Sequence, residues 1–119
     1  GHEDAPLQPV RIAGAAVACE TARLWVDAAA RRVEGRDGAR DAEGAAAYAL
    51  LAREATERAC LEVIAAVDAA VGTAAHMVGS PIERMRRDLS LFLRQAAPDA
   101  KRARAVAALT ARRVRPEGL

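Results

Sequence analysis

Alanine most constrains what this chain can fold into, because roughly a quarter of the residues are alanine and no stretch alternates as a strand would. Alanine is the best helix former but buries little area, so its helices can approach closely over a thin core. Aromatic residues make up only 3% of the 119 residues. We expect one all-α domain whose thin core draws on surface from another domain or another copy.

Glycines delimit the first two predicted helices. The first runs from about residue 9 to 34, with Pro9 in its first turn and Gly35 as its stop. The second runs from about residue 41 to 71, and Gly72 is placed to end it. The polar, glycine-rich residues 35–44 between them are predicted to be a loop.

Two prolines open the remaining helices. Residues 80–83 read Ser-Pro-Ile-Glu, which combines a capping box with a first-turn proline. A fourth, shorter helix is predicted from Pro98 to about residue 114. The predicted fold is therefore an antiparallel, up-and-down bundle of three long helices plus a shorter C-terminal helix over residues 9–115. Residues 1–8 form a leader whose Gly1-His2 resembles a tag remnant, and residues 116–119 form a tail.

The first predicted helix carries one charged stripe and two apolar rows. Charges of alternating sign recur at helical spacing, which is typical of a solvated, salt-bridged face. The charged residues are Glu20, Arg23, Asp27, Arg31 and Glu34. One apolar row consists of Val10, Val17 and Leu24. The other, on a different side, consists of Ile12, Cys19, Val26 and Val33. Two rows imply packing on more than one side, so this helix is expected to have several neighbours.

Catalytic or metal chemistry would leave a cluster of histidine, cysteine, aspartate or glutamate. His76 is the only histidine beyond the leader, and it lies in the link between two helices. Cys19 and Cys60 are far apart inside helical patterns and are expected to be buried structural thiols. The chain has no phosphate-binding loop, nucleophile elbow or paired-carboxylate pattern. We assign no catalytic residue and no metal ligand.

The charge pattern indicates which partners to expect. The net charge of +2 is the difference between 18 basic and 16 acidic residues, which argues against strong nucleic-acid binding. The basic last helix lacks stacking aromatics, and Arg112 and Arg113 are placed to offset its dipole. No apolar stretch reaches the roughly 18–20 residues of a membrane span, and no secretory signal is visible. A cytoplasmic protein is expected.

The start of the third helix is unusually rich in arginine. Arg84 and Asp88 can pair at i,i+4 spacing, and Arg87 can pair with Glu83. Such local pairs are the simpler interpretation of the segment. The alternative is that one arginine binds a carboxylate or phosphate on a partner, where its forked guanidinium can make two hydrogen bonds.

The segment Ser80-Pro81-Ile82-Glu83-Arg84-Met85-Arg86-Arg87-Asp88-Leu89, which follows a helix ending at Gly72, resembles the C-terminal helical domain of the acyl-CoA dehydrogenase superfamily. It is most similar to the branch shared with flavin-dependent monooxygenases, where a glycine turn precedes a Pro-Leu-x-Arg-x-x-Arg-Asp-Leu helix start. The Ala-rich first helix also resembles that domain's second helix.

The resemblance implies a helical bundle that completes an FAD cleft and an oligomer interface. Gly72 and Thr73 would then lie beside the flavin nucleotide, and Arg84, Arg87 and Asp88 would be interface residues. FAD would bind only after assembly with the upstream dehydrogenase domains, which this sequence does not contain, and a homo-oligomer is expected.

Two functions therefore remain open. The first is a C-terminal bundle of an acyl-CoA dehydrogenase-like flavoprotein, which takes part in an oxidoreductase without catalysing anything alone. The second is a stand-alone helical module for protein–protein assembly that binds no cofactor. The two-sided apolar first helix supports the second.

Overall fold

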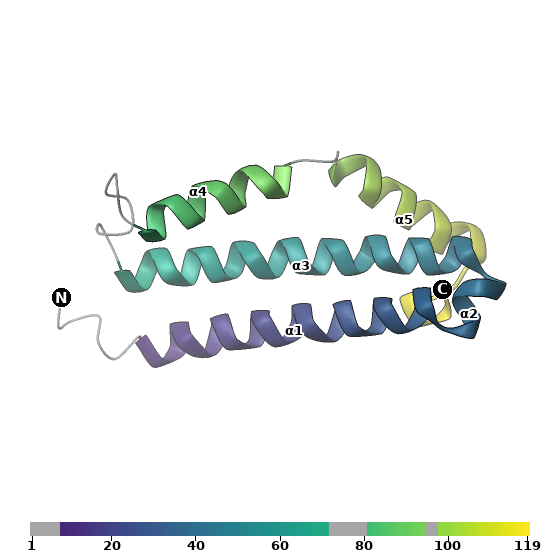
Figure 1. Ribbon diagram of the computed structural model, residues 1–119, viewed down its shortest axis with the longest axis horizontal. Helices are drawn as coiled ribbons and strands as arrows, with labels where there is room; N and C mark the ends of the chain where they lie inside the picture. The colour runs from purple at the N-terminus through teal and green to yellow at the C-terminus, as the bar shows by residue number, and fades with distance from the viewer. Residues whose placement is uncertain (1–7, 72–80, 95–97) are drawn as a thin grey trace.

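The computed structural model describes residues 8–71, 81–94 and 98–119, which fold into five α-helices and one short 3₁₀-helix (Figure 1). These residues contain no strand, and the predicted all-α class is confirmed. The helices are α1 (Gln8–Glu34), α2 (Arg36–Arg40), α3 (Ala42–Val71), α4 (Pro81–Arg94) and α5 (Pro98–Arg112), and the 3₁₀-helix η3 spans Pro116–Gly118.

Helices α1 and α3 lie antiparallel along almost their whole length, as Figure 1 shows. The predicted loop of residues 35–44 instead holds the five-residue helix α2, which turns the chain between them. Gly38 makes this tight turn feasible, because a Cβ atom there would overlap the carbonyl oxygens of Arg32 and Val33. Asp41 begins α3 by accepting a hydrogen bond from the Gly44 amide at 3.0 Å.

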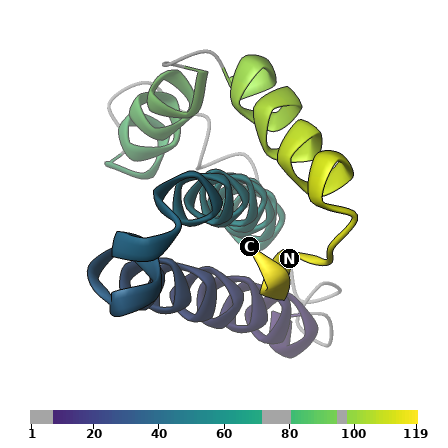
Figure 2. The same cartoon turned by 90° about the vertical axis from the view of Figure 1, so that its right-hand side faces the viewer.

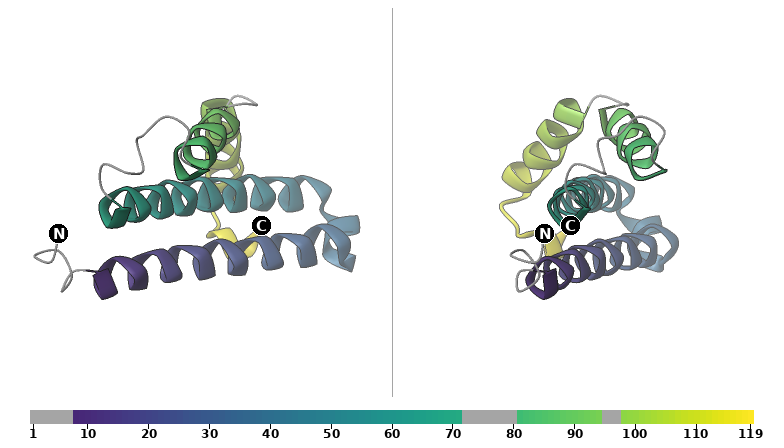
Figure 3. Two further views of the ribbon diagram at one scale, coloured as in Figure 1. Left: turned by 60° about the vertical axis from the view of Figure 1, so that its left-hand side comes forward. Right: turned by 90° about the vertical axis from the view of Figure 1, so that its left-hand side faces the viewer.

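Helices α4 and α5 lie on the side of α3 opposite to α1, so α3 forms the middle of three layers (Figures 1 and 2). The third predicted helix is shorter than expected, since α4 has 14 residues and α5 has 15. Helices α4 and α5 both run opposite to α3 in Figure 1, so α5 does not reverse the chain as an up-and-down bundle would. The two helices meet at an angle in Figure 3, so the third layer is bent.

Alanine lines the seam between α1 and α3. On α1, Ala18 is only 2% exposed, and the half-buried and buried residues recur every three or four positions. The buried seam alanines are Ala18 and Ala29 on α1 and Ala45, Ala52 and Ala59 on α3. Among the described residues, no large side chain is completely buried. Small side chains let the two helices approach closely but leave little apolar surface hidden.

The molecule is elongated, with extents of 55 × 27 × 24 Å. Its radius of gyration is 17.5 Å, whereas a compact domain of this length would have roughly 13.5 Å. The layers therefore share a narrow contact along α3 and do not surround one common core.

Candidate interaction surface

Both apolar rows of α1 face solvent. We call Val10, Val17 and Leu24 row one, and Ile12, Cys19, Val26 and Val33 row two. The six aliphatic side chains are between 49% and 68% exposed. At 100° per residue, each row lies about 90° from the alanine seam, on opposite flanks of the helix. Within the described residues α1 packs lengthwise against α3, so the further neighbours expected for α1 are not supplied by the other long helices described.

The cysteines also differ from expectation. Cys19 is exposed because it belongs to row two and not to the seam, whereas Cys60 on α3 is half-buried. Both thiols are free. Burial raises the pKa of the Cys60 thiol above its ordinary value, and the neighbouring Cys19 and Glu57 act in the same direction. The expected pair of buried thiols is therefore wrong for Cys19.

An apolar groove of about 430 Å³ runs between α1 and α3 on the row-two side. Its walls are small or aliphatic, and charged groups are confined to Glu34, Arg53 and Glu57. Arg53 and Glu57 pair with each other at 2.9 Å. The other lining residues are Val26, Ala29, Ala30 and Val33 from α1 and Ala49, Ala52 and Thr56 from α3.

The opposite groove, on the row-one side, is more polar. It has a volume of about 540 Å³ and combines Val17 and Trp25 with three charged residues of α3, which are Glu54, Arg58 and Glu62. Arg58 is 75% exposed and donates to Glu54 at 2.8 Å. The two flanks of α1 therefore present surfaces of different chemistry.

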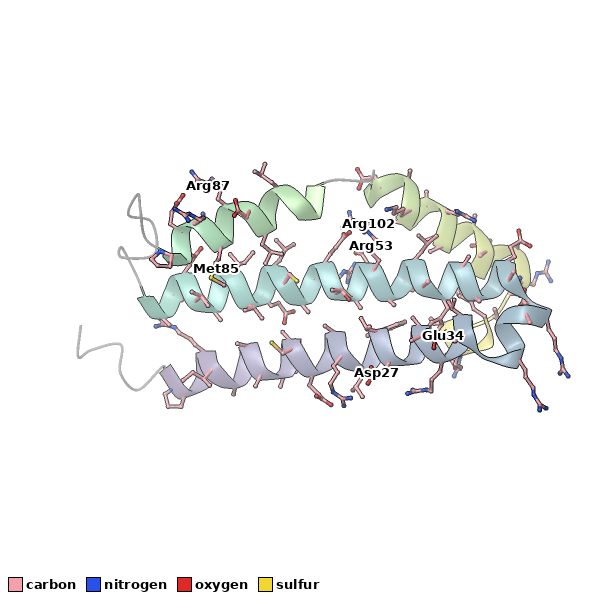
Figure 4. All side chains as sticks on the ribbon, viewed as in Figure 1. Asp27, Glu34, Arg53, Met85, Arg87 and Arg102 are labelled. Atoms are coloured by element: carbon pink, nitrogen blue, oxygen red, sulfur yellow. The ribbon has the colours of Figure 1, made fainter. Side chains whose placement is uncertain are left out.

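The predicted charged stripe occupies the outer face of α1. Arg23 pairs with Glu20 at 2.5 Å and with Asp27 at 2.8 Å, all in exposed positions. Figure 4 shows Asp27 on the side of α1 that faces away from α3. The hydrogen bond from Arg23 lowers the pKa of the Glu20 carboxyl. Solvated pairs of this kind contribute little stability.

A cluster of ionic side chains joins α5 to α3. Arg102 donates to Glu54, Glu57 and Asp99, and Figure 4 shows Arg102 and Arg53 between the two helices. Glu57 is only 6% exposed. Burial raises the pKa of Glu54, but hydrogen bonds from Arg102 and Arg58 outweigh this and leave the pKa lowered. The cluster therefore links α5 to the middle of α3.

A second ionic link joins the end of α5 to the start of α3. The Arg112 guanidinium donates to both oxygens of Asp41, at 2.5 and 2.8 Å. These bonds, and that from the Gly44 amide, lower the pKa of Asp41 to about 2. Arg112 was expected to offset the dipole of its own helix. Its main partner is instead the residue that caps α3.

The chain end folds back beside the α1–α3 turn. Arg32 lies over the Tyr48 ring, with 4.1 Å from the guanidinium carbon to the ring centroid. It also donates to the carbonyl oxygens of Glu117, at 2.8 Å, and Leu119. Leu119 is 8% exposed, so the predicted tail of residues 116–119 is packed. Trp25 contacts the same tyrosine ring, with centroids 5.3 Å apart.

The predicted interface residues lie on α4. Arg84 and Asp88 are exposed and form no ion pair with each other, whereas Arg87 approaches Glu83 at 3.9 Å. Figure 4 shows Arg87 on the outer side of α4. Arg86, which was not singled out for the site, instead ties α4 to Asp68 of α3 at 2.9 Å.

The predicted flavin contacts Gly72 and Thr73, and also His76, lie outside the described residues. The two grooves described above are lined by α1, α3 and Pro116, and neither includes a residue of α4.

Within the described ranges, no three histidine, cysteine, aspartate or glutamate side chains gather as a metal site would require. None of the described helices is both long and apolar enough to span a membrane. The chain matches no protein-family model, no curated protein and no solved structure. The resemblance to the acyl-CoA dehydrogenase superfamily therefore rests on its sequence motif alone.

Proposed function

We propose that this chain is a non-catalytic helical assembly module, which covers the exposed rows of α1 by docking on another helical surface. The observation that carries the proposal is the exposure of six aliphatic side chains on a single helix. Isolated exposed aliphatic residues are ordinary on protein surfaces, but continuous rows beside an apolar groove are typical of interaction sites.

The size of the hydrophobic effect limits what kind of docking would be stable. Covering a half-exposed valine or leucine contributes roughly 1 kcal/mol. The three aliphatic residues of one row would thus contribute roughly 3 kcal/mol, less than the estimated 4–15 kcal/mol cost of association. A partner must therefore also cover part of α3, which favours a broad helical surface over a single short peptide.

Two double variants test the proposal. Val17→Glu with Leu24→Glu disrupts row one, and Val26→Glu with Val33→Glu disrupts row two. We expect the tagged wild-type chain, purified from the cells that produce it, to have an assembled mass by light scattering. At least one variant should have a lower mass by light scattering than the wild-type assembly, while its circular dichroism spectrum stays helical. A monomeric wild type with nothing bound, unchanged in both variants, would contradict the proposal.

The flavoprotein bundle is a second proposal, and α4 favours it. Helix α4 begins at Pro81 as the motif predicts, and Arg84 and Arg87 are exposed for contact with a neighbouring domain. The test is to co-express the chain with acyl-CoA dehydrogenase upstream domains and to measure bound FAD by absorbance. Equal FAD retention with and without this chain would refute it.

A further inference from the structure

We infer that a second copy of this chain docks on the row-two side of the α1–α3 pair, giving a two-fold symmetric four-helix dimer. This inference rests on the proposed assembly function and names its partner. We define the row-two face as row two of α1 together with Ala49, Thr56 and Cys60 of α3. Val26 and Val33 of row two line the same groove as Ala49 and Thr56, and Cys60 lies near Cys19.

The charge distribution selects this face over its counterpart. The only charged residues of its groove are Glu34 at one end and the Arg53–Glu57 pair. Because Arg53 and Glu57 already neutralise each other at 2.9 Å, an apolar partner surface can approach without leaving an unpaired charge. The groove on the row-one flank contains Glu54, Arg58 and Glu62, and Arg58 is 75% exposed, so an apolar partner would have to remove more charge from water there.

The area of the face matches what a stable dimer needs. Helices of 27 and 30 residues are about 40–45 Å long at 1.5 Å per residue. A close-packed pair is about 18–20 Å wide. The flat side of the pair therefore offers about 800 Å², which is the share that each partner contributes to a standard interface.

The face is also complementary to itself. Along the groove its larger aliphatic side chains, Val26 and Val33, lie on α1, whereas the α3 half presents Ala49 and Thr56 beside the paired Arg53. A two-fold axis parallel to the helices places α1 of each copy over α3 of the other. Large residues then meet small ones, and each helix is antiparallel to both neighbours. The same surface serves both copies, as a closed dimer requires.

Val26→Glu tests the inference, with Leu24→Glu as its matched control. The two residues are two positions apart on α1 and have similar exposure, 49% and 54%, but lie on opposite flanks. We expect the purified wild-type chain to sediment as a dimer at 100 µM. Val26→Glu should weaken dimerisation at least tenfold, and Leu24→Glu should leave the dissociation constant within twofold of wild type. Maleimide labelling of Cys19 should be slower in the dimer than in the Val26→Glu variant.

A wild-type chain that stays monomeric up to 200 µM would overturn the inference, as would equal loss of the dimer in both variants. These outcomes are separable from failure of the proposed function. A chain that is monomeric alone but loses a bound partner in cells on Val26→Glu substitution uses the row-two face for a different protein. In that case the assembly function stands and self-docking is refuted.

Discussion

Asp41 performs two tasks with one carboxylate. It caps α3 through the Gly44 amide, and it binds the Arg112 guanidinium from α5 with both oxygens. Asparagine at this position could still accept the capping hydrogen bond but would carry no charge for Arg112. The two tasks can therefore be separated by substitution.

We expect Asp41→Ala to lower the melting temperature by several degrees, because it removes both the cap and the ion pair. Asp41→Asn should lower it by less than half as much. Thermal unfolding followed by circular dichroism at pH 7 measures both changes. Equal losses in the two variants would mean that the cap contributes nothing.

The same carboxylate predicts a dependence on acid. The folded pKa of Asp41 is about 2, below its ordinary value of 3.8. A lowered folded pKa stabilises the fold above the unfolded pKa, and that stabilisation is lost as pH falls through the folded pKa. The melting temperature of wild type should therefore exceed that of Asp41→Asn at pH 6, and the difference should shrink between about pH 4 and pH 2. A difference that stays constant over this range would contradict the assignment.

At the scale of residues, sequence predicts short-range pairs and misses distant ones. Arg23 is three and four positions from Glu20 and Asp27, so helical spacing alone indicates those pairs. Arg102 and Arg112 lie 48 and 71 positions from Glu54 and Asp41. Such pairs exist only once α5 has folded back over α3, and many basic residues of similar character compete for each acid in the sequence.

At the scale of helices, the alanine seam sets how closely α1 and α3 approach. Ala18→Leu inserts a branched side chain at a seam position that is only 2% exposed, and should destabilise the chain by about 1–3 kcal/mol. Ala16→Leu, at an exposed position of the same helix, is the control and should be near neutral. Urea unfolding gives both free energies. A neutral Ala18→Leu would show that the seam is loosely packed.

Arg102 is the main side-chain link between α5 and the middle of α3. Arg102→Met keeps the length and apolar stem but leaves Glu57 with one fewer partner in a buried position. We expect trypsin or elastase to cleave within α5 severalfold faster in this variant. Mass spectrometry of the fragments over time measures the cleavage rate. Arg104→Met, an exposed residue of the same helix, is the control. Equal cleavage rates in both variants would mean that Arg112 and Ala105, and not Arg102, hold α5 against α3.

Helix boundaries were predictable because their signals are local. Gly35, Pro81 and Pro98 each mark an end or a start in the structure, within a residue of the prediction. The buried face of α1 was not predictable in the same way. Large residues in rows suggested the faces that pack, but two closely packed antiparallel helices favour alanine at their contact. With alanine at roughly a quarter of all positions, no pattern distinguishes that face.

At the scale of the whole molecule, the surface left open by this arrangement couples stability to assembly. If a second copy covers the row-two face, the folded dimer gains stability by mass action and the melting temperature rises with protein concentration. We expect a rise of several degrees between 5 and 500 µM for wild type and for Leu24→Glu, and none for Val26→Glu. Differential scanning calorimetry measures the melting temperature at each concentration. A wild-type melting temperature that does not change with concentration would contradict the dimer.

Among the described helices, α3 has neighbours on two opposite sides, since α1 packs along one side, α5 lies on the other, and Arg86 of α4 reaches Asp68 there. The end of the chain is the place where the outer layers meet, because Arg32 of α1 binds Glu117 and Leu119. Away from that contact, the exposed rows of α1 can diverge to suit another binding partner while the amino acids of α4 and α5 stay the same.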